Sequence, residues 1–119
     1  MRENPVVDSS YAFALNIVSL YKHLTREKRE YVLSKQLLRS GTSIGANVNE
    51  AQAAQSRADF IGKMAIASKE ARETRYWLRL LADSQYIDRT SPRTEQLFRE
   101  IDSLKKMLTS IVKTSSNKQ

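Results

Sequence analysis

Residues 36–73, QLLRSGTSIGANVNEAQAAQSRADFIGKMAIASKEARE, contain two amphipathic helical patterns joined by a very short break. In both patterns apolar and small residues recur at spacings of three and four, which places them on one helix face. Folding the chain about residues 55–56 sets large residues of one seam against small residues of the other, as in a densely packed core. The stretch therefore predicts a tight helical hairpin. The first seam consists of Leu37, Gly41, Ile44, Val48 and Ala51, and the second, which continues past residue 73, of Phe60, Met64, Ala67, Ala71, Thr74, Leu78 and Leu81.

Gly41 is the unusual member of the first seam. A glycine inside a helix costs about 1 kcal/mol relative to alanine, so we expect another element to pack closely against it. The hairpin alignment places Ala71 opposite Gly41, and we predict that this contact explains the small residue; the alternative is a kink of the helix at Gly41.

The rest of the chain adds two more helical patterns, so four helices are predicted. The first should span about residues 8–24, and the hairpin helices about residues 25–54 and 57–84. Ser56 should cap the third helix, because a serine oxygen can accept a free backbone N–H at a helix start. The fourth should begin at Pro92 after the cap Ser91, where the missing N–H of proline is harmless. The first helix buries Phe13, Ile17, Leu20 and Leu24, and the fourth Leu97, Ile101, Leu104, Leu108 and Ile111.

Four long helices with short links in a chain of 119 residues favour a single all-α domain. Its expected architecture is an antiparallel up-down-up-down four-helix bundle. We expect residues 1–7 and 114–119 to fray at the two ends of the chain.

The composition excludes several functional classes. Hydrophobic residues make up 40% of the chain, and no run is long enough to span a membrane, so no membrane partner is expected. No secretory signal is evident. Because the chain has no cysteine, disulfides, thiolate chemistry and cysteine metal sites are ruled out, and a cytoplasmic location is predicted. The net charge of +7 is compatible with an anionic partner.

A row of polar residues runs beside the first seam, and a mixed stripe on the third helix faces it. Trp77 and Ile66 would be costly on a fully solvated face, and the glutamates between them suggest defined hydrogen-bond partners. We interpret this ridge as an interface between copies of the chain, because buried polar groups can fix register between subunits. The alternative is a solvated flank. The interface candidates are Ser43, Asn47, Glu50, Glu70, Glu73 and Trp77.

Catalytic and metal-binding patterns are weak. Di-iron bundles need a Glu-x-x-His motif on two helices, and the only histidine, His23, belongs to no such motif. No catalytic triad or phosphate loop is present. We therefore predict no catalytic residue, no metal and no cofactor, and we interpret the protein as not an enzyme. A remote alternative is a metal-dependent hydrolase that uses Glu50, Glu70 and Glu73.

Positive charge gathers at one end of the predicted bundle. Residues 22–36 and 72–99 hold eleven Lys and Arg against six Asp and Glu, a net charge of +5. We interpret this end as a site for nucleic-acid phosphates, which would give affinity without sequence specificity. The alternative is that the cations only solvate the protein. The candidate residues are Arg26, Lys28, Arg29, Arg72, Arg75, Arg79, Arg89 and Arg93.

The hairpin resembles the 23S rRNA-intervening-sequence family of four-helix-bundle proteins. The likeness rests on residues 36–39 (QLLR), Ser43-Ile44, Asn47, Glu50, Phe60 and residues 69–73 (KEARE). Many members have Asn-Ile-Ala-Glu-Gly where this chain has residues 47–51 as NVNEA. The resemblance implies a bacterial cytoplasmic homopentamer with no established enzymatic activity. Related accessory proteins of diversity-generating retroelements look like partners of nucleic acid and of reverse transcriptase.

The leading hypothesis is a non-enzymatic, homo-oligomeric bundle that binds RNA, DNA or a nucleic-acid-handling protein through its basic end. The rival hypothesis is a protein–protein assembly module with no nucleic-acid role.

Overall fold

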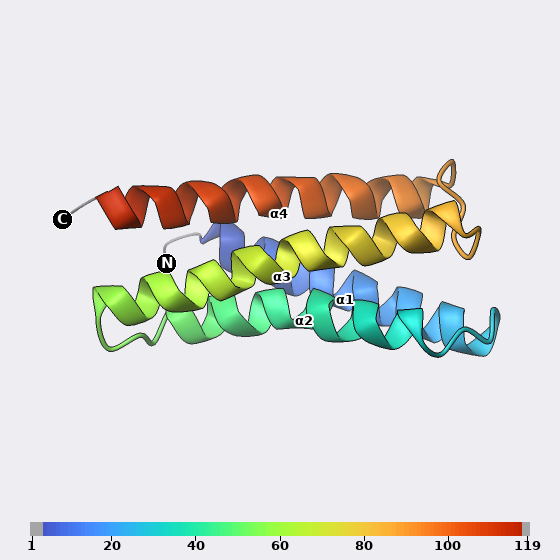
Figure 1. Cartoon of the computed structure of the whole chain (residues 1–119), viewed down its shortest axis with the longest axis horizontal. Coiled ribbons are helices and arrows are strands. Elements are labelled where there is room, and N and C mark those ends of the chain that lie inside the picture. Colours follow the sequence, from blue (N-terminus) through green and yellow to red (C-terminus); the bar gives the residue numbers. More distant parts are fainter. Residues whose placement is uncertain (1–3, 118–119) are drawn as a thin grey trace.

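The structure, a computed structural model, describes residues 4–117, and these form four α-helices in an antiparallel bundle (Figure 1). The helices are α1 (Pro5–Arg26), α2 (Leu33–Ala51), α3 (Arg57–Asp83) and α4 (Pro92–Asn117). Consecutive helices pack against each other and α1 closes the bundle against α4. The prediction of an all-α up-down-up-down bundle is therefore confirmed.

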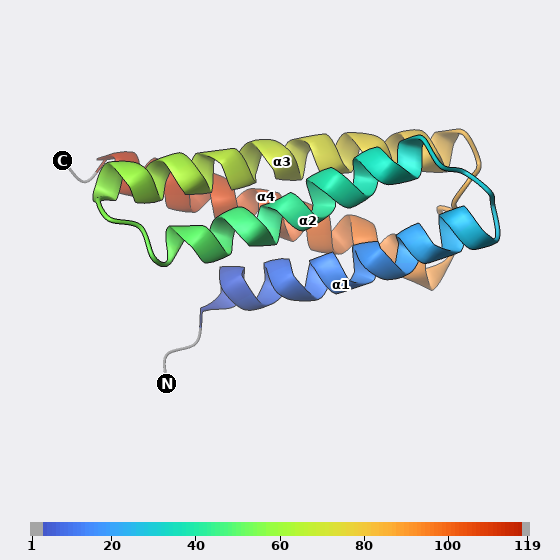
Figure 2. The ribbon, with the colours of Figure 1, turned by 90° about the horizontal axis from the view of Figure 1, so that it is seen from below.

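The connections divide the bundle into two ends. The α1–α2 and α3–α4 connections lie together at one end, and the α2–α3 connection lies at the other, with the start of α1 and the end of α4 (Figures 1 and 2). The bundle is elongated, with principal extents of 48 × 27 × 22 Å. This arrangement brings together the chain segments on which the predicted basic end depends.

The core follows the seams that the sequence predicts. All five residues of the α2 seam are buried, and in α3 only Phe60 keeps partial exposure. Thr74 Oγ1 donates a hydrogen bond of 2.9 Å to Ser40 Oγ and links the two helices near the predicted hairpin alignment. Arg39 reaches Glu70 across the same pair of helices at 3.3 Å.

The reason predicted for Gly41 was wrong. A Cβ atom on Gly41 would meet Cγ1 and Cγ2 of Ile17 on α1 at 3.0 Å, so α1, and not Ala71 of α3, requires the small residue. Gly45, one turn later, faces the same helix, and a Cβ there would lie 3.2 Å from the backbone oxygen of Ser10. The two glycines therefore let α1 and α2 approach closely.

The start of α2 is the largest difference from the predicted helix bounds. The sequence predicts a helix from residue 25, whereas α1 continues to Arg26 and α2 begins at Leu33. In the connection between them Arg29 has a φ of 53°, which is incompatible with a continuous helix. The backbone N–H of Glu30 donates to Leu24 O at 2.9 Å and closes the turn.

The ends of the chain also differ from the prediction. Residues 5–7 were expected to fray but belong to α1, and Val6 is buried in the core. Residues 114–117 were expected to fray but continue α4 to Asn117. Residues 1–3 and 118–119, which were also expected to fray, lie outside the described part of the chain.

Both predicted serine caps are confirmed. Ser56 Oγ accepts a hydrogen bond from the backbone N–H of Asp59 at 3.0 Å, and α3 begins at the next residue, Arg57. Ser91 Oγ accepts from the backbone N–H of Thr94 at 3.2 Å, with Pro92 as the first residue of α4.

Candidate functional site

The candidate site is the bundle end formed by the α1–α2 and α3–α4 connections, called the cationic end below. Arg26 ends α1, and Lys28 and Arg29 follow it in the connection to α2. Arg89 lies in the α3–α4 connection and Arg93 in the first turn of α4. Five of the eight predicted phosphate-binding residues therefore lie at this end, and all five are exposed.

The three predicted residues on α3 are less favourably placed. Arg72 lies near the middle of the helix, where its Nη1 donates to Ser68 Oγ at 3.1 Å. Arg75 pairs with Asp102 of α4 at 2.7 Å, and Arg79 with Asp83 at 3.6 Å. Carboxylates of the chain itself therefore offset two of these three charges.

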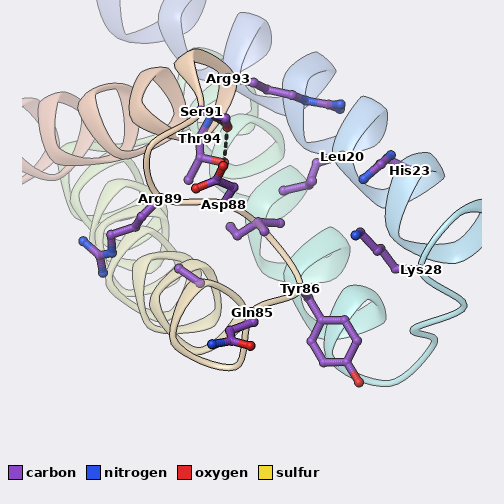
Figure 3. A pocket seen from close by; sticks show the side chains of 12 residues that line it. Leu20, His23, Lys28, Gln85, Tyr86, Asp88, Arg89, Ser91, Arg93 and Thr94 are labelled. Carbon is purple, nitrogen blue, oxygen red and sulfur yellow. Dashed lines mark hydrogen bonds between the residues drawn. The ribbon is translucent and has the colours of Figure 1, made fainter.

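Arg89 is also partly engaged within the chain. Its Nη2 lies 4.0 Å from Asp83 Oδ1, and its guanidinium sits over the Phe98 ring at 4.5 Å from the centroid. Figure 3 shows this side chain pointing away from Lys28 and Arg93.

Four cations at this end keep their charge available. Across residues 4–117, no carboxylate oxygen lies within 4.0 Å of the charged groups of Arg26, Lys28, Arg29 or Arg93. Arg93 donates instead to the hydroxyl of Ser19 on α1 at 2.9 Å, which leaves its positive charge uncompensated. These four side chains form the strongest candidate for contact with an anion.

A pocket of about 500 Å³ opens at the cationic end, between the end of α1 and the α3–α4 connection. Leu20 and Ile87, which are 2% and 8% exposed, belong to its apolar lining. Figure 3 shows His23, Lys28 and Arg93 on the side of the pocket nearest α1. The sequence did not predict this pocket, because residues from α1, α3, α4 and both connections build it jointly.

Asp88 is the acidic residue among those that line the pocket. The hydroxyl and the backbone N–H of Thr90 both donate to its Oδ1, at 2.7 and 2.9 Å. These hydrogen bonds hold the pKa of Asp88 below its usual value, so the group is ionised at neutral pH. The pocket therefore has the Asp88 carboxylate and the Arg89 guanidinium on the side of the α3–α4 connection, and the positive charges of Lys28 and Arg93 on the side of α1.

Glu30 is a buried carboxylate that serves the same end of the bundle structurally. Its oxygens accept hydrogen bonds from the backbone N–H groups of Val32, Leu33 and Ser34 at 3.2, 3.0 and 2.7 Å. Burial alone would raise the pKa of Glu30, but these hydrogen bonds outweigh it and the pKa is lowered. Glu30 thus caps α2 and fixes the loop that carries Lys28 and Arg29.

The predicted interface ridge divides into two clusters. On α3, Glu70 is 6% exposed and Trp77 Nε1 donates to Glu73 at 3.1 Å. Arg39 of α2 pairs with both glutamates. Arg39 was missed as a member of the ridge, although it precedes Ser43 by four residues and so extends the polar row by one turn.

The second cluster lies within α2. Asn47 Nδ2 donates to the backbone oxygen and to the hydroxyl of Ser43 at 2.9 and 3.1 Å, and both residues are partly buried. Glu50, the third residue of the predicted row, is exposed. In the part of the chain that the structure covers, no three His, Cys, Asp or Glu side chains gather as metal ligands would. The carboxylates of Glu70 and Glu73 are instead engaged by Arg39.

None of the helices within residues 4–117 combines the length and apolar character that a membrane span requires.

Comparison with known proteins identifies relatives of nearly the whole chain. Residues 2–110 match the family model described as 23S rRNA-intervening sequence protein. A crystal structure of a protein of unknown function, from the S23 ribosomal protein family of Bacteroides thetaiotaomicron, is 55% identical in sequence and superimposes with a TM-score of 0.86. The likeness covers 91% of this chain and 98% of that one. A comparison with curated proteins gives no significant match.

Proposed function

The chain belongs to the 23S rRNA-intervening sequence protein family, and on this premise we propose that it is a non-enzymatic, homo-oligomeric binding protein whose cationic end contacts nucleic acid or a nucleoprotein. The observation that carries the proposal is the cluster of Arg26, Lys28, Arg29 and Arg93, four exposed cations without a carboxylate partner in the described chain. Phosphates are the anions that such a cluster would meet along a nucleic acid.

The mode of binding follows from the residues available. Arginine and lysine contacts to phosphates set affinity and position but carry no sequence information. We therefore propose sequence-independent binding that weakens with salt. The 23S rRNA in the family description makes RNA the first polymer to test.

The proposed assembly uses the ridge of Arg39, Glu70, Glu73 and Trp77. Ile66 and Tyr76, which are 44% and 58% exposed, lie on the same helix as the last three of these residues and would be covered by a second copy. The family resemblance favours a homopentamer, in which the positive charges of several cationic ends would act together on one nucleic acid. The absence of cysteine favours the cytoplasm as the setting.

The rival function is a protein–protein assembly module with no nucleic-acid role. Two observations support it: the pairing of Arg75, Arg79 and Arg89 with carboxylates of the chain, and the exposed apolar side chains on α3. In that case the remaining cations would serve solubility alone.

A binding experiment with a charge-matched control separates the two functions. Binding of a fluorescent single-stranded RNA, and of DNA of the same sequence, is measured by anisotropy at low and at physiological salt. The triple variant Arg26→Gln, Lys28→Gln, Arg93→Gln removes three charges from the cationic end. The control Lys105→Gln, Lys106→Gln, Lys113→Gln removes three from the second half of α4.

The proposal predicts that only the first variant weakens binding. It also predicts that the logarithmic salt slope falls by about 2, since each lost contact to a single strand reduces the slope by about 0.7. Equal losses for both variants, or no binding of RNA and DNA at low salt, would contradict the nucleic-acid function and favour the assembly module.

A further inference from the structure

The pocket at the cationic end has two chemically different parts. Leu20, Ala82 and Ile87 supply an apolar lining, and Tyr86 and His23 add two rings. Lys28 and Arg93 supply cationic groups beside this lining (Figure 3). A phosphate alone would use the cations and leave the apolar surface uncovered. A ligand that carries an apolar ring next to a phosphate would use both parts.

We infer that the pocket receives one unpaired nucleotide of a single strand, with its base against Leu20, Ile87 and Tyr86 and its phosphate beside Lys28 and Arg93. The inference rests on the proposed function and refines it, because it names the form of nucleic acid that the cationic end selects. The volume of about 500 Å³ lies within the range of roughly 300–1,000 Å³ that is typical of small-molecule pockets.

The distribution of charge orients the nucleotide. Asp88 lies on the side of the α3–α4 connection and would repel a phosphate there. Arg89 also lines this side, but its guanidinium sits over Phe98 and points away from Lys28 and Arg93, which attract the phosphate to the side of α1 (Figure 3). The Asp88 carboxylate can accept a hydrogen bond from an exocyclic amino group, such as that of cytosine. His23 adds a ring N–H that can donate to the phosphate or the sugar.

A paired base cannot occupy the pocket without leaving its helix. Unstacking and unpairing a base from a duplex costs a few kcal/mol, whereas a base in a single strand is already accessible. Stacking or apolar burial of a base is sequence-tolerant and worth about 1–3 kcal/mol, which corresponds to about 5- to 150-fold in affinity. The cationic end should therefore bind single strands more tightly than duplexes of equal charge.

The decisive comparison uses the full-length, unmodified protein. Three fluorescent RNA probes of equal length are titrated at low salt: an intact single strand, the same strand with abasic nucleotides, and a blunt duplex. The abasic strand keeps the phosphates and lacks the bases. We expect the intact strand to bind about 5- to 150-fold more tightly than the abasic strand, and more tightly than the duplex per binding site.

The three possible results have separate meanings. Equal affinity for intact and abasic strands would overturn the pocket inference and leave phosphate binding by the cationic end intact. Absence of binding for all three probes would overturn the proposed function as well. A preference for the intact strand supports both, and the variants below then test whether the pocket is the site.

Ala82→Phe places a ring in the pocket without changing charge, and Ala58→Phe, on an exposed residue near the other end of α3, is the matched control. We expect Ala82→Phe to remove the preference for the intact over the abasic strand and Ala58→Phe to keep it. Persistence of the preference in folded Ala82→Phe would place the base elsewhere and overturn the inference. Ala82 and Tyr86 both pack partly against the core. Tyr86→Ala, which removes a ring and does not insert one, serves as a second variant and should reduce the same preference.

Discussion

Gly41 of α2 lies so close to Ile17 of α1 that an added Cβ would sit 3.0 Å from both Cγ atoms of the isoleucine. Ile17 is fully buried in the core, so it has little room to move. The packing of α1 on α2 therefore depends on a residue whose helix propensity is poor. Gly62, on the exposed part of α3, has open space where its Cβ would be.

Substitution by alanine should have opposite effects on stability at Gly41 and at Gly62. Gly41→Ala gains up to about 1 kcal/mol of helix propensity but loses about 1–3 kcal/mol through overpacking, so we expect net destabilisation of about 1 kcal/mol. Gly62→Ala meets no neighbour and should stabilise by up to about 1 kcal/mol. Urea unfolding followed by circular dichroism measures both. Stabilisation of similar size in the two variants would contradict the close approach of α1 to α2.

The sequence predicted which face of each helix is buried but not which helix lies opposite. Periodicity identifies a seam such as Leu37 to Ala51, and it holds no information on which of two neighbouring helices a residue of that seam meets. Gly41 belongs to the seam and was assigned to Ala71, whereas Ile17 lies nearer. The start of α2 was missed for a different reason. Residues 25–32 contain neither glycine nor proline. The helical run is broken by the positive φ of Arg29, and Glu30 caps the start of α2 through hydrogen bonds from backbone N–H groups.

Glu30→Gln tests this capping role. The carboxylate accepts three backbone N–H groups while 9% exposed, and its loss should destabilise the protein by about 1–2 kcal/mol at neutral pH. Thermal unfolding at pH 7 measures the change. Glu95→Gln, on an exposed residue in the first turn of α4, is the control and should change stability by less.

The contribution of the Glu30 carboxylate to folding stability should decrease at acidic pH. Because the pKa of Glu30 in the folded protein is lowered from its ordinary value of 4.5, its contribution is complete above about pH 4.5. It is lost as the pH falls through the folded-state pKa. The stability of Glu30→Gln should therefore decline less steeply below pH 4.5 than that of the unmodified protein. Parallel stability profiles would show that the carboxylate does not act as this cap.

Gln85 ends α3 in a conformation that favours glycine. Its φ is 70°, and the N–H groups of Gln85 and Tyr86 donate to the carbonyls of Ala82 and Leu81 at 3.1 and 2.9 Å, which is the Schellman arrangement. Gln85→Gly should stabilise the protein by about 0.5–1 kcal/mol, because glycine adopts this conformation without strain.

Arg29, with a φ of 53°, shares the left-handed backbone conformation of Gln85. Arg29→Gly should give a similar gain in unfolding free energy but also weaken RNA binding, since it removes one of the cations proposed to contact phosphate. Chemical denaturation and RNA titration are carried out on both variants. Because Gln85 lines the pocket at the cationic end, the control for charge is Arg29→Gln. Retention of RNA binding in Arg29→Gln together with its loss in Arg29→Gly would show that loop conformation, and not charge, controls the interaction.

The site could be predicted from sequence only as a collection of charges. The topology correctly gathered Arg26, Lys28, Arg29, Arg89 and Arg93 at one end, because alternate connections of an up-down bundle meet there. Which cations are offset was not predictable, since Arg75 pairs with Asp102 on another helix. The pocket was missed for the same reason: its residues are brought together only by tertiary packing.

The interface ridge, with Asn47 on α2 and with Glu70 and Trp77 on α3, predicts the assembly state. If Trp77 and Glu70 lie at an interface between copies, the unmodified protein should sediment as a particle several times heavier than the 13.6 kDa chain. Trp77→Ala should reduce that mass, and so should Asn47→Leu. Tyr11→Ala, on an exposed residue of α1, is the control and should leave it unchanged. A particle mass of one chain for the unmodified protein would contradict the interface.

Substitution of Arg75 and of Arg26 should distinguish a cation that stabilises the bundle from a cation that binds phosphate. Arg75 is paired with Asp102 at 2.7 Å and lies 5.6 Å from the centroid of the Phe98 ring, whereas Arg26 has no carboxylate partner in the described chain. Arg75→Gln should lower stability by at most about 1 kcal/mol, because the pair is partly exposed, and should leave RNA affinity nearly unchanged. Arg26→Gln should weaken RNA binding and leave stability nearly unchanged. Unfolding curves and RNA titrations of both variants check this, and equal losses of affinity would show that the ion pair opens to admit phosphate. The available charge would then extend along α3 from the cationic end, and the stripe of Arg72, Arg75 and Arg79 would belong to the binding surface after all.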